Sequence, residues 1–533
     1  MERLNKKIII ISVLIVVVML IVVITIILKN KKSNKQIPEK VNEPTNTVQV
    51  ESTTKTLDEY ISEFGGTKVS QPKTDMCYVT KDGKEYTVYN DGEIVEGNVE
   101  IWDGGSIEPA ADEVGNYNIY SPKELKWIAD KVISGENDFS GVTITLRKTI
   151  DLGARQNEDG TWDGPIWNSI VGFLEKDSNS QEVVDEEPID VENSNVIDEN
   201  LKRFAGVFQA ENASIRGMRV DSDKNYQGLF GFSSGIIQNI VLKNSYIKGT
   251  SSVGAIVGLN AGKVLNSKVI NTQIIGNDKV GGAVGTLSTG AFIENVDIDK
   301  TTSVSSANKY IGGICGYANN NTSISQCVFS GVINGKDYVG GIVGITFFGI
   351  QMRNCTVKGA NITGDNIVGG IAGYNKAQVE TCYIEKNEDK ETSIKAISNV
   401  GGITGVNFTM GNIENVISNA NIEATGDNVG GITGINNASI TNALNQGNIT
   451  VNNDSSLKVG GVAGENASES FIYTSYSEGL ISNKKHAGGI YGANFGQVDK
   501  CYYLENTVKT DSIEDSEFEK SQSEFNELKN KKE

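Results

Sequence analysis

The sequence predicts an all-β protein built around a right-handed parallel β-helix, and two observations lead to that prediction. The first is a glycine-rich hexamer, VGGIVG at residues 339–344, which occurs in ten related copies spaced 27 to 32 residues apart. The second is a short alternating, β-prone stretch after most copies, such as IENVDI, MRNCTV and VDKCYY. A near-constant period with strands and no room for a helix is typical of a solenoid with one coil per repeat.

The repeat region is placed at residues 206–506, with the last glycine of each hexamer as its marker. Stacking one unit per coil predicts about 10 to 12 coils at the spacing of neighbouring β-strands. A β-propeller is the alternative repeat architecture, but its blades need about 40 to 45 residues, more than these units have. The marker glycines are Gly231, Gly258, Gly285, Gly316, Gly344, Gly373, Gly405, Gly434, Gly464 and Gly492.

The hexamer also predicts which side chains face the core. Position four is Ile, Val or Ala in the full copies, so Ile342 and its equivalents are expected to point inward. Position five varies and is expected to point outward. The glycines at positions two and six then fall on the inner face, where they leave room in a crowded interior. A bulge at the third position would change this facing.

Four cysteines occupy one equivalent slot in the second half of the repeat, where other copies have Val296, Val416 or Ala443. The slot therefore favours a small apolar group, and free cysteine is one. A disulfide between neighbouring coils remains an alternative. The four are Cys327, Cys355, Cys382 and Cys501.

A short amphipathic helix is predicted ahead of the repeats, in SPKELKWIADKVISG. Ser121 and Glu124 form a capping box, with Pro122 at the first helical position. Gly135 ends the helix. An open coil end would expose core and unpaired strand edges. We therefore expect this helix to cover the first coil, in a region of cap and first coils at 106–205.

The order of these motifs resembles the GLUG-motif repeat proteins of bacterial surfaces over about residues 100–505. It runs IWDGG, YSPKELKWIADKV, FSGVTITLRKTIDLG, FAGVFQAENASIRGMRV and GLFG, followed by the VGGIVG units. Similar repeats occur in the non-catalytic part of bacterial IgA-specific metalloproteases and in adhesin-like proteins. The resemblance implies a parallel β-helix that acts in surface display, adhesion or substrate presentation. The chain departs from the family at QAENAS (209–214), where an Asp-Gly-Asn-Gly-like turn is frequent, and no zinc protease motif follows the repeats.

Three further segments lie outside the repeats. Residues 58–105, with turns at Asp82-Gly83 and Asp91-Gly92, predict a small hairpin or three-stranded module. Residues 175–200 are strongly acidic and are expected to form a solvated loop between early coils. Residues 507–533 form a charged C-terminal tail whose apolar side chains could dock on the last coil.

The start of the chain predicts a membrane anchor. Residues 8–28 carry no charge and are long enough for a bilayer-spanning helix, which needs about 20 apolar residues. We expect an uncleaved signal anchor with a cytoplasmic tail at 1–7 and a flexible linker at 29–57. Basic residues flank both ends, so the positive-inside rule does not decide the orientation. The large domain after the span favours a single-pass protein with that domain outside the cell.

Composition excludes several functional classes. Lys and Arg number 48 against 67 Asp and Glu, for a net charge of −19, which repels nucleic acid. His486 is the one histidine, so the two-histidine zinc motifs are excluded. The sequence predicts no cofactor, no metal and no catalytic residue.

The favoured function is therefore a non-enzymatic adhesion, binding or display module on the surface of a Gram-positive bacterium. Its expected partners are the membrane, through one span, and glycans, host proteins or envelope proteins. A polysaccharide lyase or glycoside hydrolase on a β-helix scaffold is an alternative, with Asp297 and Asp299 or Glu380 and Glu385 as carboxylate pairs. A cytoplasm-facing membrane scaffold is a second alternative.

Aromatic residues within or just after the hexamers are the candidate ligand contacts. Aligned along one side of the coils, they would stack on sugar rings. Packing between coils or at corners is the structural alternative. These residues are Phe347, Phe348, Tyr374, Phe408, Tyr491 and Phe495.

Overall fold

The computed structural model describes residues 55–170, 172–173, 201–387, 390–453 and 458–530. The expected tail at 1–7, span at 8–28 and acidic loop at 175–200 lie outside these residues, as does nearly all of the expected linker at 29–57. In the part of the chain that is described, no helix is both long and apolar enough to cross a bilayer.

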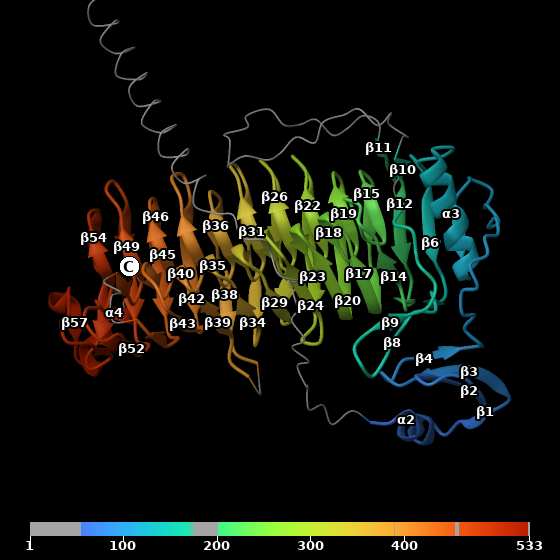
Figure 1. Ribbon diagram of the computed structural model, residues 1–533, viewed down its shortest axis with the longest axis horizontal. Helices are drawn as coiled ribbons and strands as arrows, with labels where there is room; N and C mark the ends of the chain where they lie inside the picture. The colour runs from blue at the N-terminus through green and yellow to red at the C-terminus, as the bar shows by residue number, and fades with distance from the viewer. Residues whose placement is uncertain (1–54, 171, 174–200, 388–389, 454–457, 531–533) are drawn as a thin grey trace, which may run out of the picture. The chain divides into compact units, whose positions relative to one another are not determined.

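The described chain is an all-β parallel solenoid of about 12 turns with few helices (Figure 1). Strands of successive coils form one sheet of 31 strands, one of 10 from β15 (Phe230–Ser233) to β53 (Tyr491–Asn494), and one of 8 from β18 (Ser251–Gly254) to β48 (Val459–Gly460). Neighbouring coils pair in parallel and in register, so that Val339 lies opposite Val368. The predicted solenoid is confirmed.

In eight of the ten copies the hexamer lies on two strands separated by a bend. In the copy at 339–344, β30 (Asp337–Gly340) ends at position two and β31 (Val343–Thr346) begins at position five. Ile342 and Val343 are both fully buried. The inward facing of position four is thus confirmed. The predicted outward facing of position five is wrong. Side chains alternate between faces only within an uninterrupted strand, and here a bend separates positions four and five from the strand before them.

The hexamer glycines mark places where backbones meet. A Cβ built on Gly340 would lie 2.0 Å from Val343 O and 2.9 Å from Ala372 Cα of the next coil. A Cβ on Gly344 would lie 2.6 Å from Ile311 N of the preceding coil. The crowding expected at these positions therefore comes from backbone atoms. The 8-stranded and 10-stranded sheets approach each other where these glycines have a hydrogen in place of a side chain.

The slot shared by the cysteines lies in the core. Cys355 and Cys382 are fully buried, and each Sγ lies within hydrogen-bond reach of backbone carbonyls, such as Arg353 O at 3.5 Å from Cys355. All six cysteines are free. The residue before the slot has a positive φ, as in Asn354 at 54°, and asparagine tolerates this conformation better than most residues. This explains the recurring Asn in these stretches.

At the N-terminal end, the helix predicted between Ser121 and Gly135 is present as α3 (Pro122–Ser134). Ser121 and Glu124 form the capping box, and Gly135 adopts the left-handed conformation at the C-cap. The apolar stripe of α3 packs into the same core as the first coils, beside β6 (Thr143–Leu146).

Residues 57–96 form an antiparallel module with more elements than the sequence predicted. It contains α2 (Leu57–Phe64), β1 (Thr67–Lys73), β2 (Met76–Lys81), β3 (Lys84–Tyr89) and β4 (Ile94–Glu96). A second capping box, made by Thr56 and Glu59, starts α2. Strand β1 is exposed along its whole length and so carries no alternation of apolar residues for a sequence pattern to detect.

A buried arginine joins this module to the solenoid. Arg216 is fully buried, and its guanidinium reaches Asp91 at 3.2 Å and Glu93 at 3.0 Å. Its Cζ lies 3.4 Å from the centre of the Tyr89 ring. Burial raises the pKa of Asp91, but Arg216 and Lys243 more than offset it, so that pKa lies below its ordinary value.

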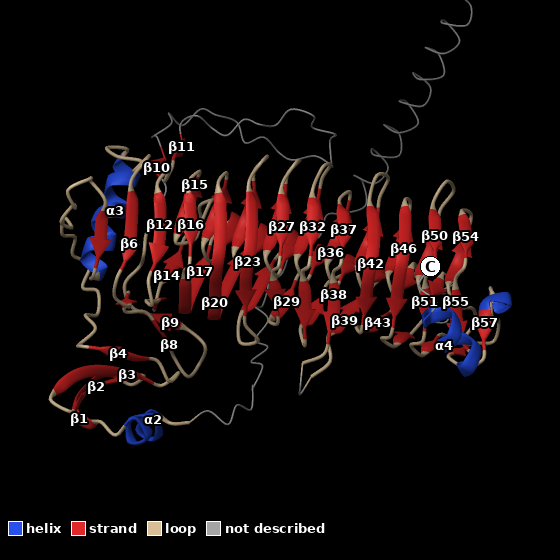
Figure 2. Ribbon diagram, turned by 180° about the vertical axis from the view of Figure 1, so that it is seen from behind, coloured by secondary structure: helices blue, strands red, loops and turns tan. Residues whose placement is uncertain are grey.

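The C-terminal residues close the other end of the stack (Figure 2). Phe525 of α4 (Gln522–Asn530) is fully buried and contacts the Tyr476 ring. Asp515 supplies the hydrogen-bond acceptors that a further coil would have supplied. Its carboxylate accepts hydrogen bonds from Gly489 N at 2.7 Å, Ile490 N at 2.8 Å and Tyr491 N at 3.0 Å. In the coil before, Val462 N and Ala463 N instead donate to Ile490 O.

The first prediction tests the backbone contact at Gly340. We expect Gly340→Ala to lower the free energy of unfolding of the full-length chain by about 3 kcal/mol or more, because the new methyl group meets backbone atoms. Gly160→Ala is the control, since its Cβ meets nothing within 4 Å and only its φ of +86° is penalised, by about 1–2 kcal/mol. Urea unfolding followed by circular dichroism measures both. Equal losses of unfolding free energy in the two variants would contradict the backbone contact at Gly340.

The second prediction concerns pH at the C-terminal end. Burial raises the pKa of Asp515 to about 6, although the three N–H groups oppose it. Because the folded pKa lies above the ordinary value of 3.8, stability is highest below pH 4 and falls as the pH rises through 6. The loss amounts to about 2 kcal/mol between pH 4 and 7.

The pH effect is measured as hydrogen exchange of the amides at 487–492, corrected for intrinsic rates, in the wild type and in Asp515→Asn. The variant has no titrating group at this position and is expected to show no such fall. A wild type whose protection follows that of the variant across this range would refute the assignment.

Candidate binding surface

The structure gathers four of the six predicted aromatic residues into one cluster. Phe347, Phe348, Tyr374 and Phe408 lie on three successive coils, and each of their rings lies near the Lys376 ammonium. The Tyr374 and Phe408 ring centres are 5.3 Å apart. The coils thus bring together rings that are up to 61 residues apart in the chain.

The other two predicted residues lie elsewhere, on the last coil. Tyr491 is only 9% exposed and packs against Phe518 of the C-terminal segment. Phe495 is 65% exposed but follows β53, three coils beyond the strand that precedes Phe408. Neither residue joins the cluster.

Three tyrosines that the sequence analysis did not select extend the cluster. Tyr317 lies 5.2 Å from Phe347, and Tyr338 lies 6.0 Å from Tyr374, between ring centres. Tyr310 lies 5.4 Å from Tyr317 and 5.0 Å from Tyr338 and so joins the two branches. We call these seven rings and Lys376 the aromatic surface. Tyr310 and Tyr338 directly precede hexamers and Tyr317 directly follows one, which is the signal that could have identified them.

Lys376 lies on a short corner of the solenoid, residues 376–377, which we call the notch. Two residues separate β36 (Ala372–Asn375) from β37 (Gln378–Glu380), whereas four residues form the corresponding corners at 347–350 and 408–411. The longer corners carry Phe348 and Phe408, whose ring centres are 4.9 and 5.1 Å from Lys376 Nζ. Such distances are those of cation–π contacts.

Buried polar side chains fix the backbone of this corner. Lys376 N donates to Thr346 Oγ1 at 3.0 Å, and Phe408 N donates to Asn375 O at 2.8 Å. The Asn375 amide donates in turn to Asn407 Oδ1 at 3.0 Å, within a ladder of asparagines that continues to Asn494. The backbone at the notch is therefore held by buried side chains whose polar groups are hydrogen-bonded, which restricts their rotation.

The backbone is strained along the same surface. Tyr310, Tyr338 and Ile367 have φ values of 63°, 56° and 57°, at the position just before their hexamers. Later coils have Asn399 and Asn428 there, and asparagine adopts this conformation at lower cost. The same position has a positive φ at Ser252 and Lys279 in earlier coils, so this conformation belongs to the repeat, and its cost is highest where the residue is bulky.

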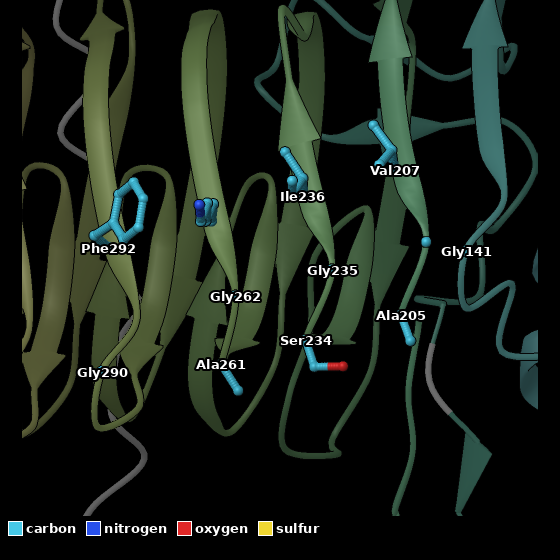
Figure 3. A pocket seen from close by; sticks show the side chains of 12 residues that line it. Gly141, Ala205, Val207, Ser234, Gly235, Ile236, Ala261, Gly262, Gly290 and Phe292 are labelled. Carbon is cyan, nitrogen blue, oxygen red and sulfur yellow. The ribbon is translucent and has the colours of Figure 1, made fainter.

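A shallow groove follows the same corner over earlier coils. It has a volume of about 350 Å³ and is floored by glycines, where a Cβ on Gly262 would lie 2.0 Å from Gly235 O. Figure 3 shows Val207, Ile236 and Phe292 in a row on neighbouring strands along it. Lys263 Nζ lies 4.8 Å from the Phe292 ring centre, a second pairing of lysine with an aromatic ring.

Three of the four carboxylates considered for catalysis are engaged by neighbouring groups. Asp297 pairs with Lys268 at 2.8 Å, and Glu380 pairs with Arg353 at 2.9 Å. Asp299 accepts hydrogen bonds from Thr302 and from Asn271 N. Within the described ranges, no group of three or more His, Cys, Asp or Glu side chains is arranged to hold a metal ion.

The comparisons with known proteins are limited in extent. No protein-family model matches the chain. A stretch of 154 residues, 28% of this chain, is 32% identical to part of Halomucin from Haloquadratum walsbyi, and it spans 1% of that protein. A crystal structure from Bacteroides ovatus, assigned as an immunoglobulin A1 protease, is 13% identical over 80% of this chain and 89% of that chain, with a TM-score of 0.32. Likeness at that score supports no conclusion about function.

Proposed function

We propose that this chain is a GLUG-type bacterial cell-surface protein whose right-handed solenoid binds glycans without acting on them. The aromatic surface is the observation that supports this proposal. It gathers seven rings from successive coils, of which Tyr310 is only 7% exposed and the other six are partly exposed, and flat rings of this kind stack on the apolar faces of sugars. The regular coils hold these rings at fixed spacing before any ligand arrives, which lowers the entropy cost of binding.

The proposal includes a single membrane span at 8–28 and an extracellular solenoid in a Gram-positive bacterium. Host or envelope proteins are further proposed partners, and no role with nucleic acid or with a cofactor is proposed. The net charge of −19 and the anchor-like run at 8–28 support these points.

The third prediction tests glycan binding by the full-length protein in mild detergent. On an array of neutral and acidic polysaccharides, Tyr374→Ala and Phe408→Ala are each expected to weaken binding about 3- to 10-fold, the loss of one stacked ring. Phe495→Ala is the matched control, because it removes an exposed ring outside the aromatic surface.

The same samples are assayed for new reducing ends and for unsaturated sugars after prolonged incubation. We expect neither product. Reproducible release by the wild type would replace the binding proposal with the polysaccharide lyase or hydrolase. Equal binding by all variants would place any glycan site away from the aromatic surface.

The fourth prediction concerns orientation. Added protease is expected to degrade the solenoid on intact cells, because the domain lies outside the membrane. A cytoplasmic protein of the same cells serves as the control for lysis. A solenoid that resists protease on intact cells and is cleaved only after lysis would support the cytoplasm-facing scaffold.

A further inference from the structure

Lys376 is the cation around which the aromatic surface is arranged, and it differs from the lysines that form ion pairs between coils. Lys268, Lys395 and Lys458 each pair with a carboxylate. In the described part of the chain, no carboxylate lies within 4.0 Å of Lys376 Nζ, which faces four aromatic rings instead. An ammonium has three hydrogen-bond donors, and rings satisfy none of them as an anion would.

The corner gives this ammonium a defined approach. Phe348 and Phe408 flank it on the longer corners, and Tyr374 precedes it on its own coil at 5.8 Å. An acidic group that enters the notch would meet Nζ, while the sugar rings on either side of it would meet Phe348 and Phe408. One polymer chain running along the coil axis satisfies both contacts.

Charge selects the class of polymer. The protein carries a net charge of −19, with 48 Lys and Arg against 67 Asp and Glu, so cations that can attract an anion are in the minority. At the far edge of the aromatic surface, Lys309 lies beside Asp337, which it faces across the strand pair. Lys279 and Lys309 each face one ring of the aromatic surface, whereas Lys376 faces four, so an anion that lies among the rings meets Lys376.

We infer that the notch at Lys376 binds an acidic polysaccharide, with a carboxylate of the polymer on Lys376 Nζ and its sugar rings against Phe348, Tyr374 and Phe408. The inference rests on the proposed glycan-binding function and specifies its ligand class.

The fifth prediction uses two probes with one backbone, polygalacturonate and its fully methyl-esterified form. Hyaluronate is included as a second acidic polymer. The full-length protein is expected to bind an acidic probe at least 10-fold more tightly than the ester at low salt. This preference should shrink as salt rises, because the lysine–carboxylate contact is screened.

Lys376→Met keeps an unbranched side chain in the notch and removes the charge. It should lose at least 5-fold in affinity for the acidic probe and a smaller factor for the ester, so that the preference for the acid shrinks, whereas Lys376→Arg should retain the preference. Lys395→Met is the matched control, with the same change of net charge on a lysine that pairs with Glu423. Circular dichroism confirms that each variant is folded.

The outcomes separate the two proposals. Equal binding of acid and ester, unaffected by Lys376→Met, would overturn the acidic ligand and leave glycan binding in place. Binding of neither probe by the wild type would overturn the acidic ligand as well. If the wild type bound no polysaccharide on the array, both proposals would be overturned.

Discussion

The close approach of backbones at the hexamer glycines is the constraint on which the rest of the structure depends. A methyl group at Gly340 would overlap Val343 O, and one at Gly344 would overlap the preceding coil. With hydrogen alone at these positions, the two small sheets lie close together and Val339, Ile342 and Val343 all reach the core. Each fully buried aliphatic side chain then contributes about 1.5–3 kcal/mol, once per coil.

Both ends of such a stack have to be covered, since the terminal coils would otherwise present unpaired N–H and C=O groups. The two ends use different chemistry. Helix α3 covers apolar side chains at the N-terminal end. At the C-terminal end, the Asp515 carboxylate accepts the hydrogen bonds that the next coil would have accepted. That carboxylate is buried to do so, which is why its pKa rises to about 6.

Function is built from what the repeat leaves variable. The hexamer and the asparagine ladder fix the path of each coil, while corner length and the residues that flank the hexamers differ between coils. A two-residue corner between two four-residue corners makes the notch at Lys376. The same short corner between two longer ones recurs at 437–438, so the aromatic surface is distinguished by the side chains on its corners and beside its hexamers.

The sequence by itself determined the parallel solenoid, the inward Ile342 and the helix between Ser121 and Gly135, because period, alternation and capping are local patterns. Local patterns could not determine the facing of Val343, since the bend at Gly341 depends on contacts with the next coil. Nor could they show that Phe347, Tyr374 and Phe408 share a surface while Phe495 does not. Only the tertiary structure decided this, because the register of stacked coils and the lengths of their corners set which distant side chains meet.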